Sequence, residues 1–225
     1  AAVAGGALGF TDAIYAVHER GKAMQEAVPQ GQGAMLAVLG TDDEQVKKIC
    51  TWTETESGFK PLEPANFNCP GQVVISGNKE ATDWLKENYK PEVFDPPIKR
   101  IKFIELKVSA PFHCSLMNPA QEKMTLILNG LKFKNSRIPI VQNIDANETQ
   151  DSELIKSKLI GQISAPVLWT QCITRMRELG VSHIVELGSG QVLSGLIKKI
   201  DSTHFKTFNM QTIEDLKLLE SKANF

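Results

Sequence analysis

Hydrophobic and polar positions alternate with changing period along the chain, and the first regular stretch has the period of a helix. Thr11 is expected to cap a helix that runs to Val28, with Phe10 and Tyr15 forming a hydrophobic staple. The apolar stripe of this helix consists of Ala13, Ala16, Val17, Met24 and Ala27. Arg20 falls in the same stripe. Because a buried guanidinium needs a partner, Arg20 either binds a substrate carboxylate or forms a salt bridge with an acidic residue of the chain.

Between Gly33 and Val108 the pattern switches repeatedly between strand alternation and helical spacing. It predicts strand 34–39, helix 42–52, strands 65–67 and 72–76, helix 79–89 and strand 101–108. This β-α-β-β-α-β order is the ferredoxin-like arrangement, a compact unit that can be inserted into another domain. Asn66 to Gly71 are expected to form the hairpin between the two middle strands, with Asn66 and Asn68 as turn formers in the commoner interpretation. Residues 53–62 and 90–99 are expected to be solvent-facing loops.

The second half of the chain alternates between strand and helix patterns. The expected elements are strand 138–144, helices 153–162 and 166–179, strand 182–187, helix 191–200, strand 205–210 and helix 212–223. Such alternation predicts an α/β fold with a mostly parallel sheet covered by helices. The domain organisation that follows is one α/β core formed by residues 1–30 and 109–225, with residues 31–108 as an inserted small subdomain.

His113 lies on a short connection between the strand 101–108 and a helix that opens at Asn118. Asn118 is expected to cap that helix, and Gln121 to complete a capping box three residues later. A histidine held in such a position is a candidate general base with a pKa close to its ordinary value, although a lone histidine is more often a packed core residue. Cys114 beside it is expected to be a small packing residue, because neighbouring side chains on an extended turn diverge.

Gln162 shares a helix face with Ile155 and Leu159, so a second polar side chain is expected to face inward. Solvation or capping at a helix end is the alternative. A histidine base also needs a nucleophile, and the chain contains no Gly-x-Ser-x-Gly elbow.

Composition removes several classes of protein. The net charge is -1, with 25 basic and 26 acidic residues, which gives no electrostatic case for binding nucleic acid. The four cysteines form no Cys-x-x-Cys pair, so neither a zinc site nor a disulfide framework is indicated, and a reducing compartment is expected. No apolar run approaches the ~20 residues of a membrane span. Phosphate-binding glycine motifs are absent from the sequence as well.

Several separated motifs, in order, resemble one family over nearly the whole chain. They are Arg20-Gly-x-x-Met24-Gln-Glu-Ala, Gly33-Ala-Met, Asn66-Phe-Asn-x-Pro-Gly-Gln-Val-Val-Ile-Ser-Gly77, Ala110-Pro-Phe-His113, Pro166-Val-x-Trp169 and Glu186-x-Gly-x-Gly-x-Val-Leu193. Together they resemble malonyl-CoA:acyl carrier protein transacylase. The resemblance implies a hydrolase-like core that carries the ferredoxin-like subdomain, with malonyl-CoA and acyl carrier protein as partners and neither a cofactor nor a metal.

The resemblance also assigns roles to individual residues. His113 falls on the catalytic histidine, Arg20 on the carboxylate-binding arginine, and Gln162 on the glutamine whose backbone carbonyl fixes the histidine tautomer. The remaining matches place Met24, Asn66, Asn68 and Phe112 in the substrate pocket, where the bulk of Phe112 excludes branched malonyl groups.

The nucleophilic serine of the family lies in a Gly-His-Ser-Leu-Gly elbow, which is expected a few residues before a helix whose tail is Ala1 to Gly5. The chain alone is therefore not expected to turn over. Two alternatives remain: an acyltransferase domain of a polyketide synthase or multifunctional fatty acid synthase, and a non-catalytic module that binds carrier protein. The expected location is the cytoplasm, with a plastid or mitochondrion as the alternative.

Overall fold

The computed structural model describes residues 1–222, which divide into two compact units. The first unit comprises Ala1–Cys172, and the second begins at Ile173. Within the described residues, each helix is too short or too polar to cross a membrane.

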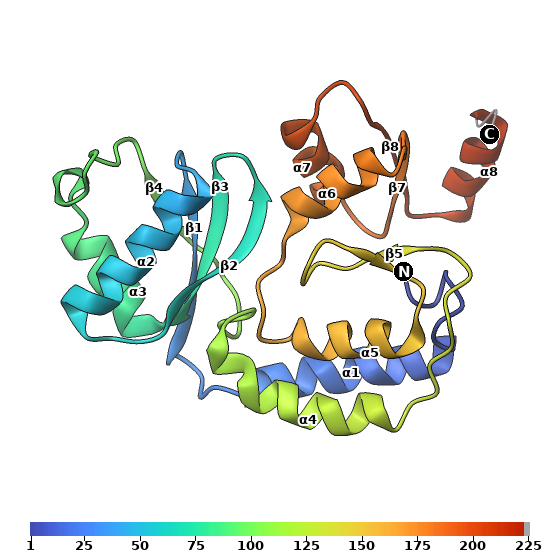
Figure 1. Cartoon of the computed structure of the whole chain (residues 1–225), viewed down its shortest axis with the longest axis horizontal. Helices are drawn as coiled ribbons and strands as arrows, with labels where there is room; N and C mark the ends of the chain where they lie inside the picture. The colour runs from blue at the N-terminus through green and yellow to red at the C-terminus, as the bar shows by residue number, and fades with distance from the viewer. Residues whose placement is uncertain (223–225) are drawn as a thin grey trace. The chain divides into compact units, whose positions relative to one another are not determined.

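A four-stranded sheet with two covering helices forms one part of the first unit. Its strands are β1 (Gly33–Leu39), β2 (Leu62–Cys69), β3 (Gln72–Asn78) and β4 (Lys102–Glu105), and its helices are α2 (Asp43–Ser57) and α3 (Lys79–Asn88). The strands lie in the order β2-β3-β1-β4, and every neighbouring pair is antiparallel. Both helices lie on the same face of the sheet (Figure 1). The elements follow one another in the order that the sequence predicts.

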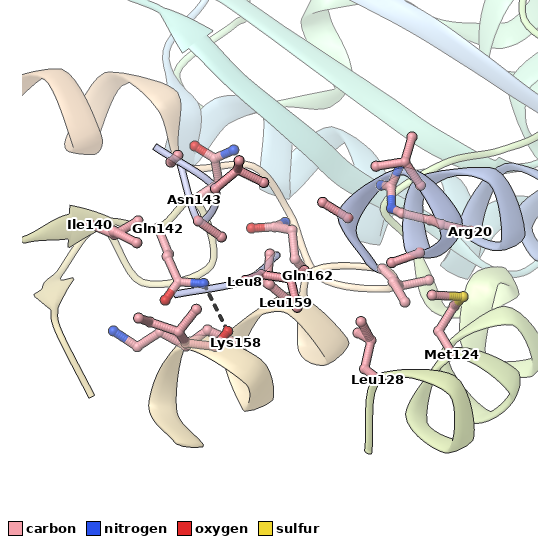
Figure 2. Close-up of a pocket in the computed structure, with 18 of the residues that line it drawn as sticks. Leu8, Arg20, Met124, Leu128, Ile140, Gln142, Asn143, Lys158, Leu159 and Gln162 are labelled. Atoms are coloured by element: carbon pink, nitrogen blue, oxygen red, sulfur yellow. Dashed lines mark hydrogen bonds between the residues drawn. The ribbon is translucent and has the colours of Figure 1, made fainter. Parts of the chain in front are cut away.

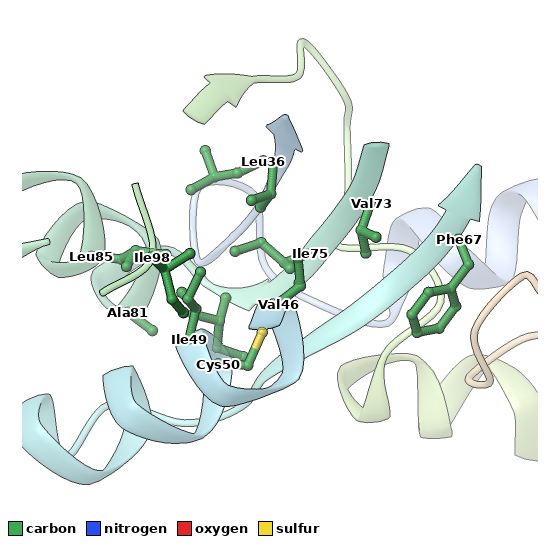
Figure 3. Close-up of a cluster of buried hydrophobic side chains, with 12 residues drawn as sticks. Leu36, Val46, Ile49, Cys50, Phe67, Val73, Ile75, Ala81, Leu85 and Ile98 are labelled. Carbon is green, nitrogen blue, oxygen red and sulfur yellow. The ribbon is translucent and has the colours of Figure 1, made fainter. Parts of the chain in front are cut away.

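The core of this lobe is a cluster of aliphatic side chains between the sheet and the two helices (Figure 3). Leu36, Ile49, Ile75 and Leu85 are fully buried in it. Ile98 joins the same cluster from the segment expected to be a solvent-facing loop, so that expectation is wrong at this position. An apolar residue in a connection packs inward when the neighbouring helix and strand leave space for it.

Helix α2 is one turn longer than predicted. It continues to Ser57 and ends where Gly58 takes a left-handed conformation at φ 73°. Thr53, placed in a loop by the sequence, is fully buried within the helix and donates its hydroxyl hydrogen to the Ile49 carbonyl. That local bond removes the usual cost of burying a threonine.

The predicted hairpin at Asn66–Gly71 is also wrong in its extent. Asn66 and Asn68 lie inside β2, which has bulges on either side of Asn66, and the turn is confined to Pro70 and Gly71. Gly71 has φ 77°, a conformation that suits glycine at a tight turn. The two asparagines are therefore not turn formers.

Three helices pack together in the other part of the first unit: α1 (Phe10–Glu26), α4 (Asn118–Asn129) and α5 (Ser152–Gly161). Their shared cluster includes the fully or nearly fully buried Met24, Met117 and Met124. The predicted beginning of α1 is wrong, because the helix starts after Gly9 without a side-chain cap. Phe10, Tyr15 and Val17 are 70%, 50% and 68% exposed, so neither the staple nor Val17 as an inward position is found.

The remaining strands are short. β5 (Ile140–Val141) and β6 (Glu148–Thr149) form an antiparallel pair, far shorter than the strand predicted at 138–144. Helix α6 (Trp169–Glu178) leads into the second unit, which contains β7 (His183–Leu187), α7 (Val192–Ile200), β8 (Lys206–Met210) and α8 (Ile213–Lys222). Among the strands of residues 1–222, only β7 and β8 pair in parallel, so the mostly parallel sheet is reduced to this pair. The predicted end of the last helix at Ala223 lies outside the described residues.

Candidate active site

The loop between β4 and α4 holds His113 in an uncommon backbone conformation. His113 has φ 60°, in the left-handed region, which costs a non-glycine residue about 1–3 kcal/mol. The predicted capping box after it is wrong: a 3-10 turn, Ser115–Met117, precedes α4, and the helix has no side-chain cap. Gln121 instead accepts a hydrogen bond from the Ser164 hydroxyl. The left-handed conformation of His113 persists only where the surrounding residues hold the loop in place.

The ring of His113 is oriented by the backbone at the end of α5. Its Nδ1 lies 3.1 Å from the carbonyl oxygen of Gln162. A carbonyl only accepts, so Nδ1 carries the hydrogen and Nε2 is left as the acceptor in the neutral ring. The Gln162 side chain in turn donates from Nε2 to the carbonyls of Ala165 and Pro166, at 2.9 and 3.1 Å. These bonds fix the segment that presents the Gln162 carbonyl.

Burial lowers the pKa of His113 below its ordinary value. The hydrogen bond to the Gln162 carbonyl acts in the opposite direction, and the nearby positive charge of Arg20 lowers the pKa further. The expectation of an ordinary pKa is therefore wrong. A histidine with a lowered pKa stays neutral, and so competent as a base, to lower pH.

Arg20 lines a cavity of about 450 Å³ bounded by α1, α4, α5, β5 and the first residues of the chain. Gln162 lines the same cavity, and the labelled side chains of both residues appear together in Figure 2. Most of the other lining side chains are aliphatic, among them Leu8, Leu128 and Leu159. Burial lowers the pKa of Arg20, which shows that its charge is partly removed from water.

Two interpretations of Arg20 were open, and the structure separates them. Among the described residues, no carboxylate or other acceptor forms an ion pair or hydrogen bond with Arg20. The internal salt bridge is therefore not found. A partly desolvated cation without an internal partner favours an anionic ligand.

The other predicted site residues lie in different surroundings. Met24 is 2% exposed and packs in the helical core, away from the lining of the cavity. Phe112 is half-buried and packs against both that cluster and residues of β1. Asn66 forms an isolated parallel bridge with Val167, and Asn68 is half-buried on β2. The structure therefore brings together His113, Gln162 and Arg20. The other predicted pocket residues, Met24, Phe112, Asn66 and Asn68, do not line the cavity.

One contact at this loop, between Glu63 and Ser115, was not predicted from the sequence. The Glu63 carboxylate accepts hydrogen bonds from the Ser115 amide at 2.7 Å and from the Ser115 hydroxyl at 2.8 Å. Glu63 lies outside the strand 65–67 that the sequence predicts and enters β2 only in the structure, so the pattern of the sequence offered no signal for this contact. Cys114 is fully buried and donates to the Pro111 carbonyl, as expected of a packing residue, and burial raises the pKa of its thiol.

This arrangement can transfer a proton and bind an anion. His113 offers a neutral nitrogen with a fixed tautomer, and Arg20 offers a planar cation to the cavity. Across the part of the chain that the structure describes, no three histidine, cysteine or acidic side chains gather in a way that could hold a metal ion.

The relatives found by sequence comparison and those found by structure comparison are the same kind of protein. The chain is 41% identical over 215 residues to the malonyl CoA-acyl carrier protein transacylase of Staphylococcus aureus strain MSSA476, covering 96% of this chain and 67% of the relative. It superposes with a TM-score of 0.86 on the transacylase from Streptococcus pneumoniae, at 38% identity, covering 99% of this chain and 70% of that one. A malonyl-transacylase solved in complex with a type II PKS acyl-carrier protein gives a TM-score of 0.85 at 37% identity, over 98% and 68% of the two chains. No protein-family model matches the chain.

Proposed function

Because the chain belongs to the malonyl CoA-acyl carrier protein transacylase family, we propose that it transfers a malonyl group from malonyl-CoA to the phosphopantetheine thiol of acyl carrier protein. The observation that carries the proposal is the pairing of an oriented histidine base with an arginine that has no partner among the described residues. His113 Nδ1 is held by the Gln162 carbonyl, and Arg20 faces the cavity that Gln162 lines. A base and a carboxylate-binding cation are the two groups that malonyl transfer requires of this part of the enzyme.

The reaction proceeds in two half-reactions through a serine ester. The 225 residues contain no Gly-x-Ser-x-Gly, and the proposal therefore requires that this serine be supplied by other residues. Nε2 of His113 accepts the hydroxyl proton as the serine oxygen attacks the thioester carbonyl. The carbon–sulfur bond then breaks, and the same nitrogen returns the proton to the departing thiolate of CoA.

The second half-reaction uses the same histidine in the reverse sense. Nε2 of His113 accepts the proton of the phosphopantetheine thiol while its sulfur attacks the malonyl ester. The ester bond breaks, and the proton goes to the serine oxygen. The Gln162 carbonyl keeps the ring in one tautomer throughout, because the imidazolium that forms in each step donates to it from Nδ1. None of these reaction steps uses a metal or a cofactor.

Substrate selection rests on residues around the cavity. Arg20 pairs with the malonyl carboxylate through its planar fork. Phe112, directly before the base, is proposed to limit the room for branched acyl groups. Asn66 and Asn68 on β2 are proposed to contact the substrate, although neither lines the cavity around Arg20. Met24 lies in the core, and its packing there stabilises α1, the helix that carries Arg20.

For the fold, we propose that residues 31–108 form a ferredoxin-like subdomain inserted into a hydrolase-like core made of residues 1–30 and 109–225. The antiparallel sheet order β2-β3-β1-β4, with both helices on one face, supports the subdomain. The TM-score of 0.86 to the streptococcal transacylase over 99% of this chain supports the core.

Two measurements test the proposed function. The residues that precede Ala1 in the full-length protein should contain a serine elbow. The full-length protein incubated with radiolabelled malonyl-CoA should then form a malonyl ester and pass it to acyl carrier protein, and His113→Ala should slow both steps by about 10²–10⁴-fold. A His113→Ala protein that acylates at the wild-type rate would contradict the assignment of the base. Carrier protein that binds without receiving a malonyl group would favour the non-catalytic module.

A further inference from the structure

The loop that carries His113 is attached to the small lobe on both sides of the histidine. Before it, Pro111 packs so closely on β1 that a Cβ atom at Gly33 would lie 2.3 Å from its ring. After it, the amide and hydroxyl of Ser115 both donate to the carboxylate of Glu63. The left-handed His113 therefore sits between two fixed points.

The Glu63 end of this attachment has a rigid support. Glu63 lies on β2, in register with Ser76 of β3, within the four-stranded antiparallel sheet. The preceding residue, Leu62, is fixed in its turn, because its amide donates to the Glu54 carboxylate of α2 at 2.7 Å. A strand held by these bonds moves little relative to the sheet. Glu63 therefore holds Ser115, and with it the loop, in a fixed position.

A carboxylate suits this attachment better than any neutral side chain. Ser115 presents two donors that converge from one residue, and an ionised glutamate has two oxygens that only accept. Charge-assisted bonds of this kind are shorter and stronger than neutral ones. A glutamine in the same place would keep one accepting oxygen, and an alanine would keep none.

We infer that Glu63 is a positioning residue for the transacylase reaction, which fixes the His113 loop through Ser115 so that Nε2 meets the reacting hydroxyl or thiol. The inference rests on the proposed function of His113 as the base. Glu63 itself touches neither substrate nor reacting atom in this scheme. Its contribution is to hold the base in the productive geometry, where a displacement of about 1 Å costs about 10²-fold in rate.

The test compares four variants of the full-length protein. Glu63→Ala should lower kcat for malonyl transfer about 10–100-fold while leaving the KM for malonyl-CoA within about twofold, because the loop moves and the carboxylate-binding arginine does not. Glu63→Gln should recover part of the loss by keeping one acceptor, and Ser115→Ala should lose less than Glu63→Ala because its amide donor survives. Asp42→Ala is the matched control, since it removes a carboxylate bond to a backbone amide in the same lobe, that of Gln45, without touching the loop or its attachment. It should lower the melting temperature and leave kcat unchanged.

Each outcome decides the inference. A Glu63→Ala protein with wild-type kcat would overturn it, and so would a parallel loss of kcat in Asp42→Ala, which would show that only lobe stability matters. A rise in KM without a fall in kcat would assign Glu63 to substrate binding instead. His113→Ala is measured alongside: if it stays active, the proposed function itself fails, whereas an inactive His113→Ala with an unaffected Glu63→Ala rejects only the positioning role.

Discussion

Replacement of Arg20 by alanine should change which acyl group the enzyme prefers. The guanidinium is partly buried, lines the cavity, and has no ion-pair partner among residues 1–222. A malonyl carboxylate would give it two oxygens, whereas an acetyl group would leave it unpaired. Arg20→Ala should therefore lose malonyl transfer and gain relative activity on acetyl-CoA or longer neutral acyl groups.

The size of the effect follows from the bonds that are lost. A hydrogen bond to a charged group contributes about 1.5–3 kcal/mol, and each 1.4 kcal/mol is about tenfold in kcat/KM. The malonyl-to-acetyl ratio should fall by at least about 10²-fold when both bonds of the planar fork disappear. Arg20→Lys should recover little of it, because an ammonium group is a point charge that lacks the bidentate geometry.

The structure also predicts that Arg20→Ala changes the stability of the protein very little. An arginine in an internal ion pair leaves an unpaired carboxylate behind when it is removed, and the protein is destabilised. Because the structure shows no such carboxylate for Arg20 within its described part, Arg20→Ala should shift the melting temperature by less than about 2 °C.

The assay measures kcat/KM for malonyl-CoA and acetyl-CoA in the full-length wild type, Arg20→Ala, Arg20→Lys and a control. Arg177→Ala is the control, because it removes an exposed arginine whose partner is Asp201, and such surface pairs contribute little. An unchanged malonyl-to-acetyl ratio in Arg20→Ala, together with a clear fall in melting temperature, would show that Arg20 is a structural ion-pair partner.

Three further predictions concern the base and its support. The acidic limb of kcat/KM should have an apparent pKa below that of ordinary histidine, since burial lowers the pKa of His113 and the base works in its neutral form; a limb above the ordinary value would contradict this. Gln162→Ala should be milder than His113→Ala because the carbonyl that accepts from Nδ1 survives, and equal losses in acylation rate would mean that the side chain matters more than the carbonyl. Gly33→Ala should lower the unfolding free energy by about 1–3 kcal/mol because its Cβ would meet Pro111, whereas Gly21→Ala in α1 has open space and should be neutral or stabilising in the same denaturant titration.

Periodicity predicted the elements of the small lobe and their order. Alternation and helical spacing are local properties, so β1, α2, β2, β3, α3 and β4 follow in the expected sequence. Their ends were less predictable, because a boundary depends on what the last turn meets. Thr53 continues α2, where it is fully buried, and Ile98 packs into the core although its surroundings are rich in proline.

The sequence also identified two residues of the candidate site. A charged side chain in an apolar helix stripe identified Arg20, and a histidine on a short connection identified His113, because both patterns conflict with ordinary core packing. Neither pattern could choose between a functional role and a structural one. The structure adds that no carboxylate lies beside Arg20 among the described residues and that Nδ1 lies close to the Gln162 carbonyl. The functional role of both residues stays a prediction.

The tertiary structure alone decided which distant residues meet. Gln162 orients His113 through a backbone carbonyl, which every residue possesses, so no side-chain pattern could reveal that contact, and before the structure only the family resemblance implied it. Glu63 and Ser115 are 52 positions apart, and their bonds depend on how β2 lies against the His113 loop. Local periodicity reports the environment of one element at a time, whereas these contacts arise only when the chain closes long loops and brings separate elements together.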